Sequence, residues 1–186
     1  MMKKSLLLLA ALVLGGCATH WPETALLNPQ VIPSNQQYYS GNRITMEGVD
    51  KREAAYVFSI KKKEKAPVLV NSSQPLNNLL AEKLAEGLRS QGLEVGNSGT
   101  TNLTLAISTA AVTVEEKTFT YVTKSKVSLQ VIADFQGNKL TKQFNMSSSK
   151  EEPGEPTMAD LESTLNQQLG SVLQQIMADE ALRGYL

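Results

Sequence analysis

The sequence predicts an α+β fold: a two-layer sandwich in which an antiparallel sheet of about four to six strands carries two helices on one face. Three observations predict it. Leucines recur at helical spacing over residues 75–89, apolar and polar residues alternate over residues 119–135, and a second helical stripe closes the chain after residue 157. Because each of these elements has one apolar face to bury, we expect both helices to lie on the same face of the sheet.

The first residues have the layout of a secretory signal peptide. Lys3 and Lys4 precede an apolar stretch over residues 6–14, and the small residues Gly15 and Gly16 follow it. The apolar stretch is too short to span a bilayer, because a membrane-spanning helix needs about 20 apolar residues. We therefore expect residues 1–16 to be removed during export.

Cys17, the only cysteine of the chain, follows these glycines directly. The sequence LGGC at residues 14–17 resembles the lipobox of bacterial lipoproteins, and this resemblance implies cleavage before Cys17 and lipidation of its sulfur and its new amine. The alternative is an odd free cysteine that oxidises with a partner. Acyl chains anchor a protein durably, since each buried CH₂ contributes about 0.8 kcal/mol. By resemblance to the sorting rule of Gram-negative lipoproteins, Ala18 in place of Asp implies the outer membrane, with the domain on its periplasmic face.

The mature chain divides into two parts. Cys17 begins a proline-rich tether over residues 17–41, and residues 42–186 form a single periplasmic α+β domain. Trp21, in the tether, lies either at the membrane interface or against the domain. Loss of the signal peptide leaves 16 of the 18 basic residues against 18 acidic ones, a net charge of −2. We expect no nucleic-acid partner, because such proteins usually carry a basic face.

Strands are expected before the first helix. The segment RITMEGVD at residues 43–50 alternates apolar and polar residues, AAYVFSI at residues 54–60 follows it, and APVLV comes after a basic run. That run consists of Lys61, Lys62, Lys63, Glu64 and Lys65. It forms either a solvated hairpin tip, whose charges oppose edge aggregation, or a contact to anionic lipid or lipopolysaccharide phosphates worth about 1 kcal/mol per lysine.

The first helix covers residues 75–89, where leucines recur every four residues and polar residues occupy the other faces. Ser72 or Ser73 can cap its start, and Pro75 suits its first turn. Gly92 can end the helix in a left-handed conformation.

A meander of long strands follows. The apolar positions 103, 105 and 107 share one face, and the parity then shifts to positions 110, 112 and 114, which indicates a bulge near Thr109. Residues 119–135 form the next strand with Phe119 on its apolar face, QGNK makes a turn, and Leu140, Phe144 and Met146 continue the face on a returning strand.

The last helix begins after the loop SSSKEEPGEPT at residues 147–157. Thr157 and Asp160 match a capping box, in which each side chain binds a backbone N–H of the other residue. An apolar stripe then runs to Ile176.

Few residues are candidates for catalysis. The sole histidine, His20, lies in the tether, so no histidine base is expected in a folded site. A zinc or iron site would need several His or Cys ligands. The carboxylate pairs at residues 115–116 and 151–152 remain, but adjacent residues on a strand point to opposite faces. We therefore expect no enzyme activity, no cofactor and no metal site.

The order of these motifs resembles the YajG family of predicted bacterial lipoproteins, whose biochemical role is not established. The shared features are the lipobox, the tether, Asp50 and Arg52 after the first strand, a leucine helix ending in GLEV, the meander and the closing helix. Asp50 and Arg52, two apart on a strand, point the same way. They form either a surface ion pair, worth under about 1 kcal/mol, or part of an interaction site.

These observations favour an outer-membrane-anchored lipoprotein that acts as a non-catalytic binding or envelope-assembly module, with the membrane and an envelope protein as its partners. The alternative is a carrier of a lipid or muropeptide, which requires an apolar cavity of at least about 300 Å³ between sheet and helix. Beyond the lipidation site Cys17, the candidate interaction residues are Asp50, Arg52, Lys61, Lys62, Lys63 and Lys65.

Overall fold

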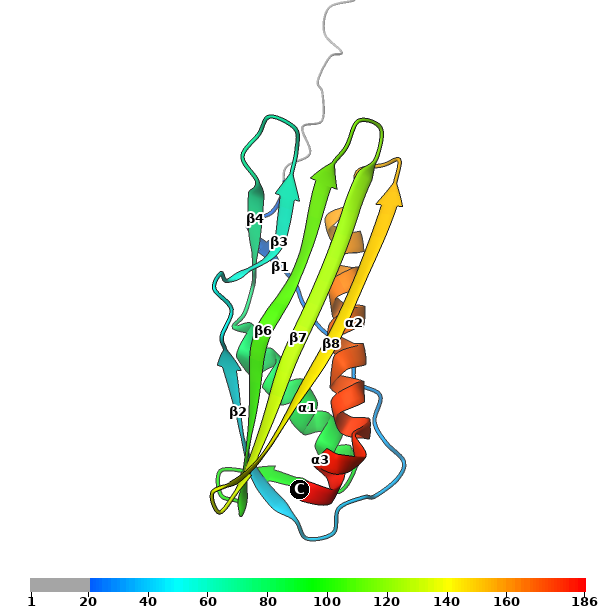
Figure 1. Ribbon diagram of the computed structural model, residues 1–186. Helices are drawn as coiled ribbons and strands as arrows, with labels where there is room; N and C mark the ends of the chain where they lie inside the picture. The colour runs from blue at the N-terminus through cyan, green and yellow to red at the C-terminus, as the bar shows by residue number, and fades with distance from the viewer. Residues whose placement is uncertain (1–20) are drawn as a thin grey trace, which may run out of the picture.

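The computed structural model describes residues 21–186 and contains one mixed sheet that curls around a helix layer (Figure 1). The strands are β1 (Thr24–Ala25), β2 (Arg43–Asp50), β3 (Tyr56–Lys61), β4 (Val68–Ser72), β5 (Glu94–Gly96), β6 (Thr101–Glu116), β7 (Tyr121–Phe135) and β8 (Asn138–Glu152). The helices are α1 (Leu76–Ser90), α2 (Met158–Ala178) and the short α3 (Glu180–Tyr185).

The long strand β6 is the central strand of the sheet. One edge of β6 pairs antiparallel with β7 along its whole length, and β7 pairs in the same way with β8. The other edge of β6 pairs in parallel with two strands in succession. Its pairing with β2 extends to Ile107, and its pairing with β3 begins at Val112. Strand β4 pairs antiparallel with β3, while β1 and β5 add in parallel to β4 and β2.

The expected antiparallel sheet of four to six strands is therefore only partly correct. Four of the seven strand pairings are parallel, and the sheet of the described residues has eight strands. Antiparallel neighbours joined by a short turn leave a local sequence pattern, whereas parallel neighbours are joined by long crossovers that leave none. The β6–β7–β8 meander was predictable for this reason, and the parallel pairings of β2 and β3 with β6 were not.

The predicted bulge is confirmed. The register between β6 and β7 shifts between Ile107 and Thr109, so that Ser108 is the extra residue. The same point is where β6 changes its partner on the other edge from β2 to β3. A bulge increases the local twist of a strand, and here it separates the two halves of β6.

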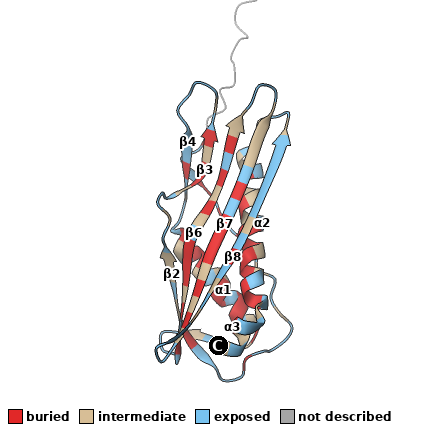
Figure 2. Cartoon of the chain, in the orientation of Figure 1, coloured by how far each residue is buried: buried red, intermediate tan, exposed pale blue. Residues whose placement is uncertain are grey.

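Both long helices lie on the same face of the sheet, as predicted. Helix α1 packs against β2, β5 and β6, and α2 packs against β6, β7 and β8. Their apolar stripes and the inward-facing residues of the strands form one continuous core. Figure 2 shows this buried surface along β6, β7 and α2. No helix within residues 21–186 has the length and apolar character needed to cross a membrane.

The helix ends agree with the sequence in part. Thr157 and Asp160 form the predicted capping box: the Thr157 hydroxyl accepts from the Asp160 amide at 3.2 Å, and the Asp160 carboxylate accepts from the Thr157 amide at 2.9 Å. Gly92 adopts the predicted left-handed conformation, with φ of 91°. A serine cap for α1 was wrong, because Pro75 is the N-cap residue and no side chain bonds there, while Ser72 ends β4.

Residues 21–41 form an N-terminal strap that packs on the domain, which corrects the predicted tether over this range. Trp21, Ala25, Leu27 and Tyr39 are buried in the core, so Trp21 packs on the protein. The spacing of these residues follows neither a helical nor a strand period, and for this reason the sequence did not reveal their burial.

Helix α2 holds the strap through its side chains and through a glycine. Glu162 accepts a hydrogen bond from the amide of Leu26, and Asn166 accepts one from the amide of Asn28, both at 2.8 Å. The strap crosses α2 at Gly170, where an added Cβ would lie 2.4 Å from the carbonyl oxygen of Gln30. The strap therefore closes the outer side of the helix layer.

Candidate functional site

Asp50 and Arg52 meet where the chain leaves β2 for β3. The Arg52 Nε lies 2.9 Å from Asp50 Oδ1, the Nη2 lies 2.7 Å from Asp50 Oδ2, and the Arg52 amide also donates to Oδ1 at 3.1 Å. The Arg52 side chain is only 7% exposed, against 31% for Asp50. The hydrogen bonds from Arg52 lower the pKa of the Asp50 carboxyl, against the effect of its partial burial. In this pair the Arg52 side chain is buried, while Asp50 lies at the surface as predicted.

The Arg52 guanidinium lies in the gap between β2 and β3 along β6, beside a groove of about 400 Å³ that Arg52, Tyr56 and Ala110 line. Its Nη1 donates to the carbonyl oxygen of Tyr56 at 3.2 Å and to that of Ala110 at 3.4 Å. Ala110 lies between Ile107, where the β2 pairing ends, and Val112, where the β3 pairing begins. Arg52 thus supplies the donor that a neighbouring strand would provide, and the pair has a structural role.

Lys61 ends β3 and residues 62–65 lie in the tip of the β3–β4 hairpin, a position that fits both the solvated tip and the contact to anionic lipid. The Lys62 Nζ lies 2.7 Å from a carboxylate oxygen of Glu155, and the Lys63 amide donates to Glu116 at 3.0 Å. The ion pair with Glu155 raises the pKa of Lys62.

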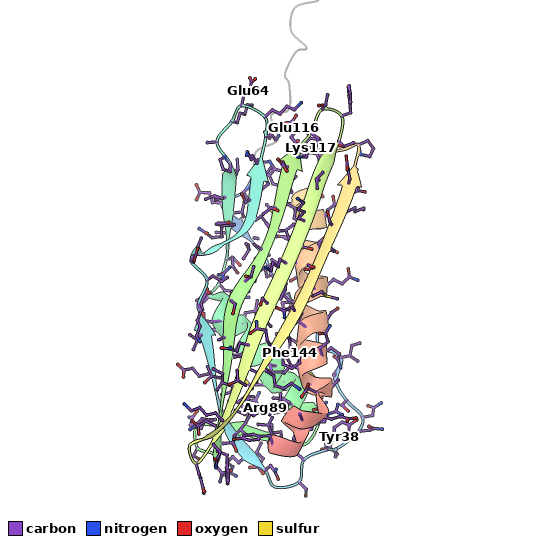
Figure 3. All side chains as sticks on the ribbon, in the orientation of Figure 1. Tyr38, Glu64, Arg89, Glu116, Lys117 and Phe144 are labelled. Atoms are coloured by element: carbon purple, nitrogen blue, oxygen red, sulfur yellow. The ribbon has the colours of Figure 1, made fainter. Side chains whose placement is uncertain are left out.

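Three loops meet at this end of the molecule, and we call them together the upper tip: residues 62–67, 117–120 and 153–157. The pairing of Lys61 with Glu115 and of Tyr121 with Glu152 sets them at the same level. Figure 3 shows Glu64, Glu116 and Lys117 at this end and Phe144 and Tyr38 far from it.

Phe119 is an exposed aromatic residue at the upper tip that the sequence placed wrongly. The alternation of residues 119–135 put it on the buried face of β7, but β7 begins at Tyr121 and Phe119 is 86% exposed. The Lys117 amide donates to the Thr120 carbonyl at 2.8 Å and closes a turn whose apex holds Phe119. A turn reverses the chain, so the parity of the strand does not extend into it.

One member of each carboxylate pair forms an ion pair with a neighbouring lysine. Glu115 lies 2.8 Å from Lys117, and Glu152 lies 2.6 Å from Lys150. Lys117 lowers the pKa of Glu115, the opposite of what a general acid at neutral pH requires. Within residues 21–186, no group of His, Cys, Asp and Glu side chains is arranged to hold a metal ion.

A polar cluster lies in the layer between sheet and helix. The amide nitrogen of Gln168, on α2, lies 2.5 Å from the hydroxyl of Ser125 and 3.0 Å from that of Ser148, and the two hydroxyls are 2.7 Å apart. Ser125 occupies an inward-facing position of β7 where the alternation would place an apolar residue. That interruption is the sequence feature by which the cluster could have been found.

Strand β8 forms an open edge of the sheet. Its 15 residues pair with β7 alone, and no strand of the described chain covers its other side. The sequence placed residues 147–152 in a loop, but they continue the strand. Polar serines without apolar alternation carry no strand period, although the pairing of Ser147 with Lys126 and of Ser149 with Lys124 is regular.

The comparisons with known proteins identify a family. A family model described as "Uncharacterized lipoprotein" matches residues 29–186. The chain belongs to this lipoprotein family. Membership supports a membrane-anchored protein of the cell envelope. Cys17, the predicted signal peptide over residues 1–16 and His20 lie outside the described residues. The search for curated relatives finds no match for the chain.

Solved structures with a similar fold come from several bacteria. A Xanthomonas campestris protein of the family model DUF330 is 9% identical, with a TM-score of 0.62 over 88% of this chain and 97% of its own. A Helicobacter pylori protein named as a candidate homolog of a neuraminyllactose-binding hemagglutinin is 10% identical, with a TM-score of 0.43 over 89% of this chain and 95% of its own. The first likeness supports the fold alone, and the second is too weak to support an argument.

Proposed function

We propose that this lipoprotein is anchored in the outer membrane through Cys17, with its domain on the periplasmic face, and that it acts as a non-catalytic binding or envelope-assembly module. Family membership supports the anchor. The observation that supports a binding role is the open edge of β8, because an exposed strand edge presents unpaired N–H and C=O groups to which an extended segment of another protein can add.

The middle of β8 is suited to such a partner. Lys139, Lys142 and Lys150 stand along the strand, and lysine on an edge opposes unspecific pairing. Between Lys142 and Lys150 lies the stretch QFNMSSS, which contains no charge and no proline. A segment of similar length can pair there, so we propose residues 143–149 as the binding edge for an envelope protein.

The alternative function, a lipid or muropeptide carrier, lacks a supporting observation. The space between sheet and helices is filled by the continuous core. A groove of about 700 Å³ lies between the strap and α2, outside the layer between sheet and helix, and its lining is mostly amide and hydroxyl side chains such as Asn28, Asn166 and Gln174. A groove of about 420 Å³ lies at the upper end of α2 and is lined in part by Lys150, Glu152 and Asp160, so neither groove offers the apolar site that a carrier requires.

Photo-crosslinking in living cells tests the binding edge. Benzoylphenylalanine replaces Ser147 or Ser149, which are exposed on β8, and as a control replaces Thr113, which is exposed on the central strand β6. We expect the two edge positions to crosslink to one envelope protein and Thr113 to give no such adduct. The absence of a reproducible adduct at the edge, or equal adducts at all three positions, would contradict the proposal.

A further inference from the structure

We propose that the upper tip rests on the lipid surface to which the chain is anchored, with the Phe119 side chain inserted among the lipid headgroups and the first acyl carbons. This inference depends on the Cys17 anchor of the proposed function. It adds the orientation of the domain on the membrane and names the residue that makes the contact.

The strap enters the domain near the upper tip. Strand β1 runs parallel to β4, with Thr24 opposite Asn71. Three residues before these lie Trp21 and Val68, and Val68 is the first residue of β4 after the hairpin tip. The described chain therefore starts close to the level of the upper tip (Figure 1).

The length of chain before Trp21 restricts the position of the domain. Trp21 lies four positions after Cys17, and four residue steps span at most about 13 Å. The opposite end of the molecule lies one length of β7 away, and 15 residues of strand measure about 50 Å. A lipid on Cys17 thus keeps the upper tip, and not the lower end, next to the bilayer.

The loops of the upper tip, which carry Phe119, are held together by side-chain interactions. The Lys62–Glu155 ion pair and the bond from the Lys63 amide to Glu116 join the three loops, and the Thr120 hydroxyl donates to Glu151 at 2.5 Å. Phe119 is the most exposed large apolar side chain of the described residues, at 86%. An exposed aromatic side chain on a loop held in this way, at the end that faces the lipid, can insert at the boundary between headgroups and acyl chains.

The charges at this end favour insertion of an apolar side chain over attraction to anionic lipid. The upper tip itself holds four lysines and two glutamates, and the strand ends next to it, at residues 61, 116, 151 and 152, add one lysine and three glutamates. Their charges balance, so the field of this end does not distinguish anionic from neutral lipid. We therefore expect contact with zwitterionic and anionic bilayers alike, with little dependence on salt.

Tryptophan fluorescence on vesicles tests the inference. The variant Phe119→Trp, as the full mature lipoprotein purified from membranes, is reconstituted into phosphatidylcholine vesicles with brominated acyl chains, which quench inserted indoles. Phe135→Trp is the matched control, because Phe135 ends the same strand at the opposite end and is also exposed. The native Trp21 contributes a constant background, which the unsubstituted protein measures. Mass spectrometry of each sample establishes the lipid on Cys17.

We expect the added indole of Phe119→Trp to emit at shorter wavelength and to be quenched several-fold more strongly than that of Phe135→Trp. Equal and weak quenching of both variants in fully lipidated protein would overturn the inference while leaving the anchor intact. An indole of Phe119→Trp that is shielded from water in native envelopes but not on vesicles would also overturn the inference, since a protein would then cover the upper tip. A mature protein with an unmodified Cys17 would overturn the anchor first and the inference with it.

Discussion

Replacing Asp50 with Asn tests whether the Asp50–Arg52 pair connects β2, β3 and β6. The variant keeps the size of the side chain but removes the charge that faces a guanidinium only 7% exposed. Loss of one partner from a fully buried pair costs about 3–5 kcal/mol, and a hydrogen bond to a charged group contributes about 1.5–3 kcal/mol. Because Asp50 is itself 31% exposed and partly screened by water, we expect the free energy of unfolding to fall by about 2 kcal/mol.

The matched control is Glu94→Gln. Arg43 also binds the Glu94 carboxylate through its Nε, at 2.8 Å, but those two side chains are 57% and 55% exposed. An exposed pair contributes about 0–1 kcal/mol. Urea unfolding of the mature protein, followed by circular dichroism, measures both variants. Equal losses of stability in Asp50→Asn and Glu94→Gln would refute the conclusion that Arg52 replaces a strand partner of β6 in the gap between β2 and β3.

The same pair predicts a pH dependence. Arg52 lowers the pKa of Asp50 in the folded protein below its ordinary value of 3.8. A carboxyl whose pKa is lower in the folded than in the unfolded protein stabilises the fold at a pH above its unfolded-state pKa. This stabilisation is lost as the pH falls through the folded-state pKa. The difference in stability between the wild type and Asp50→Asn should therefore be constant near neutral pH and should narrow below about pH 4.

Two further substitutions test the strap and the capping box. Gly170→Ala places a Cβ against the Gln30 carbonyl, so we expect added protease to cleave the strap and the free energy of unfolding to fall by about 1–3 kcal/mol. Gly184→Ala, where a Cβ meets no atom within 4 Å, should have neither effect. A strap that resists the protease in Gly170→Ala as well as in the wild type would contradict its packing on α2. Thr157→Ala removes the cap that binds the Asp160 amide and should cost about 1 kcal/mol in thermal or urea unfolding, whereas no loss would show that the box is not needed to start α2.

The elements with a fixed period were predictable from the sequence. The shift of apolar parity between residues 107 and 110 identified the bulge, because a strand has a period of two and an extra residue must reverse it. The capping box at Thr157 was predictable because its two bonds are local. The QGNK turn gave the β7–β8 hairpin, where Gln136 and Gly137 both have positive φ.

Features that depend on distant parts of the chain were not predictable. The strap carries no period, since its backbone is satisfied by Glu162 and Asn166 more than 130 residues away. The role of Arg52 depends on where β2 ends and β3 begins along β6, and these parallel registers leave no local pattern. The spacing of Asp50 and Arg52 identified them as candidate residues, but it did not reveal the gap between β2 and β3 in which Arg52 lies.

The central claim, that Cys17 anchors the chain in the outer membrane, is tested by membrane fractionation of Cys17→Ala exported with an ordinary signal peptide that has its own cleavage site. Residue 17 precedes the strap, so the domain should still fold. Phe119 alone cannot retain the protein, because burying one aromatic side chain contributes about 1.5–3 kcal/mol, far less than several acyl chains. We predict that the variant is recovered in the soluble periplasmic fraction. Recovery with the outer membrane after a high-salt wash would contradict the anchor.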